Sequence, residues 1–321
     1  LNSARTISMK GGLADSVCGF TVNKACASGM KAIDLARQAI SQGEGGVYIA
    51  GGTESMSNAP FYVNDMRWGH KLGTVSMLDT IMDEALTCPV SRMGMGLTAE
   101  EVAGRTGIRR EEMDAFAVQS QSRALAAIGA GRFADEIVPV PLKDGEMFAK
   151  DEQPRETDME SLAKLRPVFK ADGRVTAGNS STINDGASVL LIADEDVAKE
   201  HGWTPRARIA ASASAGVEPQ VMGLGPVDAV RKLCSAMSIS VSQFELIELN
   251  EAFAVQSLAV IRALDLDEEK VNVNGGAVAL GHPIGASGAR IITTLLYEME
   301  KRDLSLGLAT LCVGGGMGMA M

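Results

Sequence analysis

The sequence predicts an α/β protein in which one β-α-β unit occurs twice, and three observations support this fold class. Short apolar runs alternate with amphipathic stretches along much of the chain, as strands and helices alternate in α/β proteins. Glycine-rich turns close several of the apolar runs. A short pattern near the N-terminus is also repeated near the C-terminus, which is the mark of an internal duplication.

The first unit is expected to contain two strands with a helix between them. Gly19–Val22 predicts the first strand, and a helix should start at Ser28 and reach about Ile40, because apolar residues recur there at roughly helical spacing. Val47–Ala50 predicts a second, buried strand that Gly51 and Gly52 close.

The amino-acid composition and the hydrophobic pattern of the sequence change between residues 59 and 184. Charged residues, proline and methionine become more frequent there, and regular strand patterns thin out. Helices such as Arg110–Gly129 are expected to dominate this segment, which we interpret as an inserted lobe. Gly186–Ala193 then predicts a fully buried strand, since all but one of its residues are apolar or glycine.

The last third returns to the first pattern, with strands predicted at Phe244–Leu249, Val271–Val273 and Leu308–Val313. Helices are expected over Ala252–Leu264 and Ala286–Glu300.

The internal repeat has three parts in each copy. The first copy consists of Val22-Asn23, Ala27-Ser28-Gly29 and Ile49–Gly52. The corresponding segments of the second copy are Val273-Asn274, Ala286-Ser287-Gly288 and Cys312–Gly315. Repeats as short as this also arise by chance in glycine-rich chains. The repeat alone therefore supports a duplicated unit and a chance similarity equally well.

The composition of the chain argues against several classes of function and partner. The chain has 321 residues, enough for about two domains. Its formal net charge of -10 argues against nucleic acid or an anionic membrane as partner. Five cysteines without a CxxC pair favour a reducing compartment, and we expect a cytoplasmic location. The three histidines form no metal-binding pattern, so no metal is expected. P-loop, dinucleotide-binding and serine-hydrolase motifs are missing from the sequence.

Four residues at expected strand ends could carry chemistry. Cys26 stands where a strand gives way to a helix, so the helix N-terminus should stabilise a thiolate and lower the pKa of Cys26. His282 lies among glycine and proline residues, which would aim its ring as a base or an oxyanion donor. Cys312 precedes Gly314, whose bare N–H could bind an oxyanion, and Asn250 follows a buried strand.

Each of these residues also has a plain structural reading. An isolated cysteine such as Cys26 or Cys312 is often a small core residue. His282 could be a hydrogen-bonded loop residue, and Asn250 could cap the following helix. The convergence of all four at strand ends is what makes a single site plausible.

The motifs around these residues resemble those of the thiolases, and most closely the biosynthetic acetyl-CoA acetyltransferases, over essentially the whole chain. The matching segments are VNKACASGM (22–30), GGTESMS (51–57), MGLTAE (95–100), TAGNSSTINDGA (176–187), NEAFA (250–254), GGAVALGHPIGASG (275–288) and LCVGGGMG (311–318). The resemblance implies duplicated halves in a layered αβαβα core with an inserted loop domain. It divides the chain into an N-terminal half (1–58), a CoA-binding loop domain (59–184), a return to the N-terminal half (185–205) and a C-terminal half (206–321).

The resemblance also implies a reaction and its residues. Two acetyl-CoA molecules would give acetoacetyl-CoA and CoA, with Cys26 as the acylated nucleophile. His282 would activate Cys26 and, with a water held by Asn250, form one oxyanion site. Cys312 would be the acid/base for the second substrate, and the N–H groups of Cys26 and Gly314 would form the second oxyanion hole. CoA would be substrate and product, with no permanently bound cofactor, and would contact Leu86, Met95, Arg155, Ser161, Phe169, Ala177, Ser181, Met222, Ala252 and Phe253.

Departures from the family pattern keep alternatives open. Gly94 stands where biosynthetic members often carry histidine, so a degradative 3-ketoacyl-CoA thiolase is the second reading. A non-catalytic acyl-CoA-binding protein and a redox-sensing cysteine protein are more remote ones. Compared with the family, the first strand and helix are expected to be missing, so a targeting segment could be missing too. We also expect a homodimer or homotetramer, with Gly19–Val22 or Val47–Ala50 near the interface.

Overall fold

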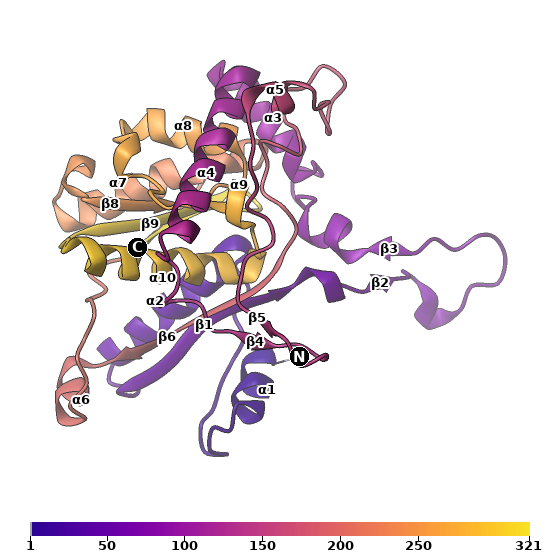
Figure 1. The fold of residues 1–321 in the computed structure, drawn as a ribbon. Coiled ribbons are helices and arrows are strands. Elements are labelled where there is room, and N and C mark those ends of the chain that lie inside the picture. Colours follow the sequence, from indigo (N-terminus) through magenta and orange to yellow (C-terminus); the bar gives the residue numbers. More distant parts are fainter. Residues whose placement is uncertain (1) are drawn as a thin grey trace.

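Two helices, α2 (Ser28–Ser41) and α10 (Ile284–Arg302), lie in contact at the centre of the molecule (Figure 1). The structure is a computed structural model and describes residues 2–321. A two-stranded sheet packs on one side of this helix pair and a four-stranded sheet on the other. Met30 and Ile33 of α2 are fully buried against α10 and the strands, and each such side chain contributes about 1.5–3 kcal/mol to stability.

The crossing of α2 and α10 depends on one glycine from each helix. A Cβ on Gly29 would lie 2.8 Å from the backbone nitrogen of Ala289, and a Cβ on Gly288 would lie 2.7 Å from that of Met30. Any larger residue would therefore push the helices apart. These glycines are equivalent positions of the sequence repeat, so the two copies meet each other at the centre of the fold.

The four-stranded sheet has the order β7-β10-β9-β8. Its strands are β7 (Ala213–Gly216), β8 (Leu246–Leu249), β9 (Gly307–Val313) and β10 (Met317–Ala320). β8 pairs with β9 in parallel, whereas β10 is antiparallel to both β9 and β7. Helix α7 (Gly225–Met237) packs against this sheet, and α8 (Ala254–Leu264) packs against α7 and the inserted lobe.

The two-stranded sheet pairs β1 (Val47–Ser55) with β6 (Asp185–Ala193) in antiparallel register, with Val47 opposite Ala193. Alternate side chains on its outer face are exposed, among them Ile49, Val189 and Leu191. The fully buried strand predicted at Gly186–Ala193 is therefore half exposed, and so is the predicted buried strand Val47–Ala50. Gly51 and Gly52 do not close that strand, because β1 continues through them to Ser55.

Residues 59–184 contain helices, as predicted, and also two short hairpins that the sequence did not predict. The elements of this segment are β2 (Phe61–Tyr62), β3 (Leu78–Asp79), α3 (Met95–Thr106), α4 (Arg110–Gly129), β4 (Val140–Pro141), β5 (Met147–Phe148) and α5 (Met159–Ala163). The β2–β3 hairpin projects away from the body of the molecule (Figure 1). The remaining helices are α1 (Ser3–Lys10), α6 (Glu195–Glu200) and α9 (Ala277–Leu280).

The predicted helices are confirmed within two residues at each end, but two predicted strands are wrong. Gly19–Val22 is not a strand, and Phe20 is 65% exposed. Val271–Val273 makes only an isolated bridge from Val271 to Ile247. An apolar run becomes a strand only when a neighbouring strand bonds to its backbone. The repeat therefore survives as a helix followed by a strand, α2–β1 and α10–β9.

Candidate active site

Cys26 lies in a short 3-10 turn, Ala25–Ala27, directly before α2. Neighbouring side chains hold this turn: Asn23 Oδ1 accepts the N–H of Ala25 at 3.0 Å, and Ser28 Oγ donates to the carbonyl oxygen of Ala25 at 2.7 Å. Ala25 has a positive φ of 44°, a conformation that costs a non-glycine residue about 1–3 kcal/mol. The surrounding hydrogen bonds thus hold strained backbone next to the sulfur, as is common at functional sites.

His282 follows α9 with its ring directed at Cys26. His282 Nε2 lies 3.3 Å from Cys26 Sγ, and His282 Nδ1 lies 2.5 Å from Ser287 Oγ. The backbone N–H of His282 donates to Asn184 Oδ1 at 2.9 Å. These three contacts fix the ring, and the fold brings together two residues that are 256 positions apart in the sequence.

Two further predicted residues meet the same sulfur. Gly314, just after β9, donates a backbone hydrogen bond to the Cys26 thiol. Cys312 in β9 is fully buried, and it lies close enough to Cys26 for the charge of that thiolate to raise the pKa of Cys312. Cys26, His282, Cys312 and Gly314 therefore form one cluster, although Cys26 is far from the other three in the sequence.

The pKa of Cys26 contradicts the sequence-based expectation. Burial of the thiol raises its pKa to about 11, although the N–H of Gly314 opposes the shift. Burial lowers the pKa of His282 to about 4, with a smaller contribution from the charge of Arg290. At neutral pH the site therefore holds a neutral thiol beside a neutral imidazole. Loss of solvation outweighs the helix N-terminus here.

Asn250 directly follows β8 and is fully buried. Its backbone N–H donates to the carbonyl oxygen of Thr310 at 3.0 Å. Among the described residues, neither Oδ1 nor Nδ2 of Asn250 has a hydrogen-bond partner. A buried amide left unpaired is costly unless a water or a ligand completes it, so this side chain is free to hold one.

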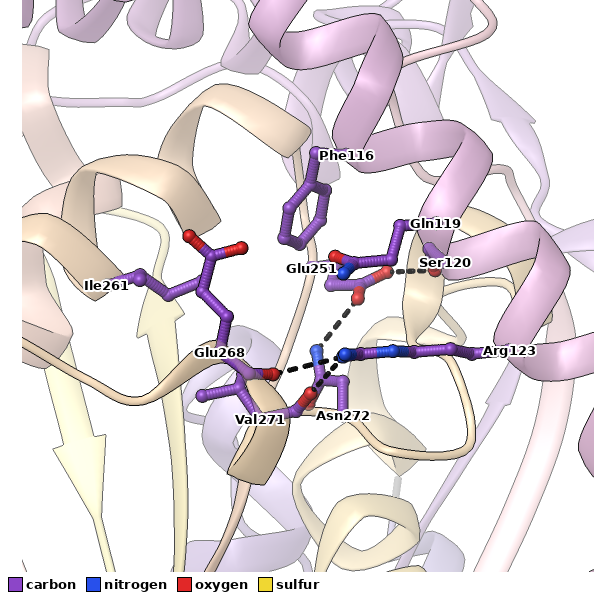
Figure 2. A pocket seen from close by; sticks show the side chains of 9 residues that line it. All are labelled: Phe116, Gln119, Ser120, Arg123, Glu251, Ile261, Glu268, Val271 and Asn272. Carbon is purple, nitrogen blue, oxygen red and sulfur yellow. Dashed lines mark hydrogen bonds between the residues drawn. The ribbon is translucent and has the colours of Figure 1, made fainter. Parts of the chain in front are cut away.

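A polar network surrounds the buried carboxyl group of Glu251, the residue that follows Asn250 (Figure 2). Glu251 accepts hydrogen bonds from Ser120 Oγ at 2.7 Å, Asn272 Nδ2 at 2.8 Å and the backbone N–H of Val278 at 3.0 Å. Figure 2 also shows Arg123 bonded to the backbone next to this carboxylate. The cavity among these groups has a volume of about 10 Å³, so the network is a structural tie between α4 and the chain segment that leads to His282.

The residues proposed for CoA lie in several small groups. Met222, Ala252 and Phe253 belong to one buried cluster, against which Met95 packs. Phe169 meets Phe253 in an edge-to-face arrangement with ring centroids 6.4 Å apart. Hydrogen bonds join three further pairs. The backbone N–H of Met95 donates to the carbonyl oxygen of Leu86, Ser181 Oγ donates to the carbonyl oxygen of Ala252, and the backbone N–H of Arg155 donates to Gln121 Oε1. Ala177, Arg155 and Ser161 are exposed. Asp158 caps α5 and accepts the backbone N–H of Ser161, which is the third residue of that helix.

Three residues that were not expected from the sequence hold the cluster in place. Ser287 and Asn184 both bond to His282, and Glu54 Oε2 accepts the N–H of Gly285 at 3.0 Å. All three lie inside motifs that resemble those of the thiolases. No local signal, however, connects Asn184 to a histidine 98 positions away.

Two structural features are absent from residues 2–321, a metal-binding cluster and a membrane-spanning helix. Within that range no group of three or more His, Cys, Asp or Glu side chains is placed to hold a metal ion. No helix in the same part of the chain has the length and apolar character needed to cross a membrane.

Comparison with known proteins identifies the family of this chain. The family models described as "Thiolase, N-terminal domain" and "Thiolase, C-terminal domain" match residues 1–196 and 203–321. An acetyl-CoA acetyltransferase of Pseudomonas aeruginosa is 51% identical over all of this chain and 83% of its own length. The crystal structure of the Bacillus anthracis acetyl-CoA acetyltransferase superposes with a TM-score of 0.97 at 47% identity, covering 99% of this chain and 82% of its own. Human mitochondrial 3-ketoacyl-CoA thiolase in complex with CoA reaches a TM-score of 0.96 at 44% identity, covering 99% and 80%. The chain belongs to the thiolase family.

Proposed function

We propose that this chain is an acetyl-CoA C-acetyltransferase that condenses two acetyl-CoA molecules through an acetyl-Cys26 thioester. The observation that carries the proposal is the 3.3 Å contact between Cys26 Sγ and His282 Nε2, with the N–H of Gly314 on the same sulfur. A thiol beside a base, with an N–H donor next to both, suits nucleophilic acyl transfer. The family and the names of its similar members support this chemistry.

In the first half-reaction, Cys26 attacks the acetyl-CoA carbonyl while His282 Nε2 takes the thiol proton. The oxyanion accepts hydrogen bonds from the N–H groups of Cys26 and Gly314. When the tetrahedral intermediate collapses, the bond to the CoA sulfur breaks and CoA leaves with the proton of Cys312. The products are acetyl-Cys26, an imidazolium at His282 and a thiolate at Cys312.

In the second half-reaction, the Cys312 thiolate removes a proton from the α-carbon of the second acetyl-CoA. Burial raises the pKa of Cys312 well above its usual range, which makes its thiolate a strong base for this step. His282 and a water held by Asn250 donate to the enolate oxygen. The new C–C bond forms as the bond to Cys26 breaks, and Cys26 recovers its proton from His282.

The CoA moiety has a candidate surface to which both the inserted lobe and the C-terminal half contribute residues. Met95, Met222 and Phe253 offer apolar contacts next to the cysteine cluster, and a Cβ on Gly314 would lie 4.0 Å from Met95 Sδ. Arg155 is exposed on the lobe, where a guanidinium suits a phosphate group. Local basic residues of this kind explain how an acidic chain would bind an anionic substrate.

The test is the covalent intermediate. Incubation with acetyl-CoA should leave one acetyl group on the peptide that contains Cys26, as detected by mass spectrometry after rapid acid quench. Cys26→Ala should lose both the adduct and turnover, while the control Cys18→Ser should keep them, because Cys18 is an exposed residue outside the cluster. Retained turnover in Cys26→Ala would refute the mechanism. CoA binding without any adduct in the parent protein would favour a non-catalytic acyl-CoA-binding protein.

A degradative 3-ketoacyl-CoA thiolase is the second candidate. Gly94 adds no side chain beside Met95, and a human 3-ketoacyl-CoA thiolase has a closely similar structure. The two activities would use the same cysteines and histidine, so only substrate length separates them. Comparing kcat/KM for acetoacetyl-CoA with that for a longer 3-ketoacyl-CoA decides between them, and a preference for the longer substrate would overturn the biosynthetic assignment.

A homodimer or homotetramer is also proposed. The outer face of β1 and β6 exposes Ile49, Val189 and Leu191, and the β2–β3 hairpin exposes Trp68 and Leu72 at 89% and 92%. Apolar patches of this kind are typical of interaction surfaces. Light scattering should show an oligomer, and a monomer would contradict the proposal. The cytoplasmic location stays a prediction.

A further inference from the structure

Ser287 lies in the first turn of α10, behind the imidazole ring of His282. It is 1% exposed, and its hydroxyl has two polar neighbours. Ser287 Oγ lies 2.9 Å from the carbonyl oxygen of Pro283 and 2.5 Å from His282 Nδ1. A hydroxyl so placed connects the backbone at the start of the helix with the ring that faces Cys26.

The direction of these hydrogen bonds follows from counting protons. A serine hydroxyl carries one hydrogen, and a carbonyl oxygen carries none. Two oxygens 2.9 Å apart, as in Ser287 and Pro283, repel each other unless that hydrogen lies between them. Ser287 therefore donates to Pro283, the common bond of a helical serine to the preceding turn. Toward His282, its oxygen can only accept.

The state of the histidine ring then follows. His282 Nδ1 must carry a hydrogen in order to donate to Ser287 Oγ. Because burial lowers the pKa of His282 to about 4, the ring is neutral at pH 7 and holds one hydrogen only. Nε2 is therefore bare, and its lone pair faces Cys26 Sγ at 3.3 Å.

We propose that Ser287 is a positioning residue that selects the His282 tautomer able to accept the Cys26 proton. Without the hydroxyl, the ring is free to place its hydrogen on Nε2, where it would block proton transfer from the thiol. When the imidazolium forms, its Nδ1–H still donates to Ser287, now as a stronger, charge-assisted bond. The consequence for catalysis rests on the proposed function, but the tautomer itself does not.

Histidine nitrogen NMR tests the tautomer directly. The chain has three histidines, and both His70 and His201 are exposed, so the signal of the buried His282 is readily assigned by His282→Asn. In protein labelled with ¹⁵N-histidine at pH 7, Nδ1 of His282 should show the shift of a protonated nitrogen and Nε2 that of a bare one. A hydrogen on Nε2 in the parent protein would overturn the proposal, whatever the enzyme's activity.

Two variants on α10 then separate positioning from simple stability. Ser287→Ala should move hydrogen to Nε2 in the same spectrum and slow acetylation of Cys26 about 10- to 100-fold, the usual effect of losing a hydrogen bond to a charged group. Thr293→Ala is the matched control, because its hydroxyl bonds to Ala289 O and Ser188 Oγ and not to the histidine. That variant should keep both the tautomer and the acetylation rate.

The outcomes also distinguish this proposal from the proposed function. Ser287→Thr, which retains a hydroxyl, should restore the parent tautomer and most of the acetylation rate. An unchanged tautomer in folded Ser287→Ala would refute the role of Ser287 even if Cys26 is acetylated. Conversely, failure of the parent protein to acetylate Cys26 would refute the transferase and leave the tautomer result standing.

Discussion

Glu248 is a buried carboxyl whose ionisation should destabilise the fold at mildly alkaline pH. It lies in β8 and is 1% exposed. Oε2 of Glu248 accepts a weak bond from Arg290 Nη1 at 3.4 Å, and Oε1 has no partner among the described residues. Burial raises the pKa of Glu248 to about 8, opposed by Arg290 and reinforced by nearby acidic residues such as Glu136.

The size of the effect follows from proton linkage. Glu248 has an ordinary pKa of 4.5 and a folded-state pKa of about 8, so between these values the folded chain keeps a proton that the unfolded chain has lost. Stability therefore falls by about 1.4 kcal/mol per pH unit across that window and stops falling above the folded pKa. From about pH 6 to about pH 8 this one group removes about 2 kcal/mol.

Glu248→Gln should abolish this part of the pH dependence, because the amide imitates the protonated acid and cannot ionise. Parent and variant should be similarly stable only below about pH 4.5, where the parent carboxyl is protonated in both the folded and the unfolded chain. In urea unfolding, the stability advantage of the variant over the parent should grow by about 2 kcal/mol between pH 6 and pH 8.

Glu245→Gln is the control. Glu245 is exposed, and hydrogen bonds from the N–H groups of Leu306 and Ser305 lower its pKa. Its stabilisation is fully present above its ordinary pKa, so the control should lose the same stability at pH 6 and pH 8. An equal difference between parent and Glu248→Gln at the two pH values would refute the reasoning.

Three further predictions rest on the same structure. Gly29→Ala should lower the free energy of unfolding in urea by about 1–3 kcal/mol, because its Cβ would overlap Ala289. The control Gly104→Ala in α3 has nothing near its Cβ and should raise the free energy of unfolding by up to about 1 kcal/mol. Equal effects of the two changes would contradict the close helix crossing. Cys312→Ser should largely keep acetylation of Cys26, because the serine hydroxyl can still donate a proton to the leaving CoA. The same variant should lower condensation by about 10²–10⁴-fold, because a hydroxyl is a much poorer base than a thiolate. Both rates are measured on one preparation, and an equal effect on the two would remove Cys312 as the base of the second step. Burial lowers the pKa of His282 to about 4. When the rate of Cys26 acetylation is measured as a function of pH, it should therefore show no inflection near the ordinary histidine pKa of 6.5. A clear inflection there would show that the ring is solvated.

Helices were predictable because their hydrogen bonds and apolar spacing are local. The expected Arg110–Gly129 helix is observed with the same bounds, and the helix expected from Ser28 ends one residue beyond Ile40. Strands depend on a partner that is distant in the sequence. Gly19–Val22 and Val271–Val273 have strand-like composition, yet neither is paired into a sheet within the described residues.

The residue types of the candidate site were also visible in the sequence, since Cys26, His282, Cys312 and Asn250 all follow or end apolar runs. The pKa of Cys26, in contrast, could not be predicted from the sequence. A helix N-terminus can be read from neighbouring residues, but desolvation depends on everything that covers the sulfur. The sequence therefore predicted a lowered pKa where the folded chain raises it.

By itself, the sequence determined the α/β class, the main helices, the family motifs and four candidate residues for the site. Only the tertiary structure decided that Cys26 and His282 lie 3.3 Å apart, that Asn184 bonds to the backbone and Ser287 to the ring of His282, and that burial raises the pKa of Cys26 and lowers that of His282. The physical reason is range: helix propensity and residue chemistry act over a few positions, whereas strand pairing, burial and the partner of each hydrogen bond are set by segments that meet only after the chain has folded.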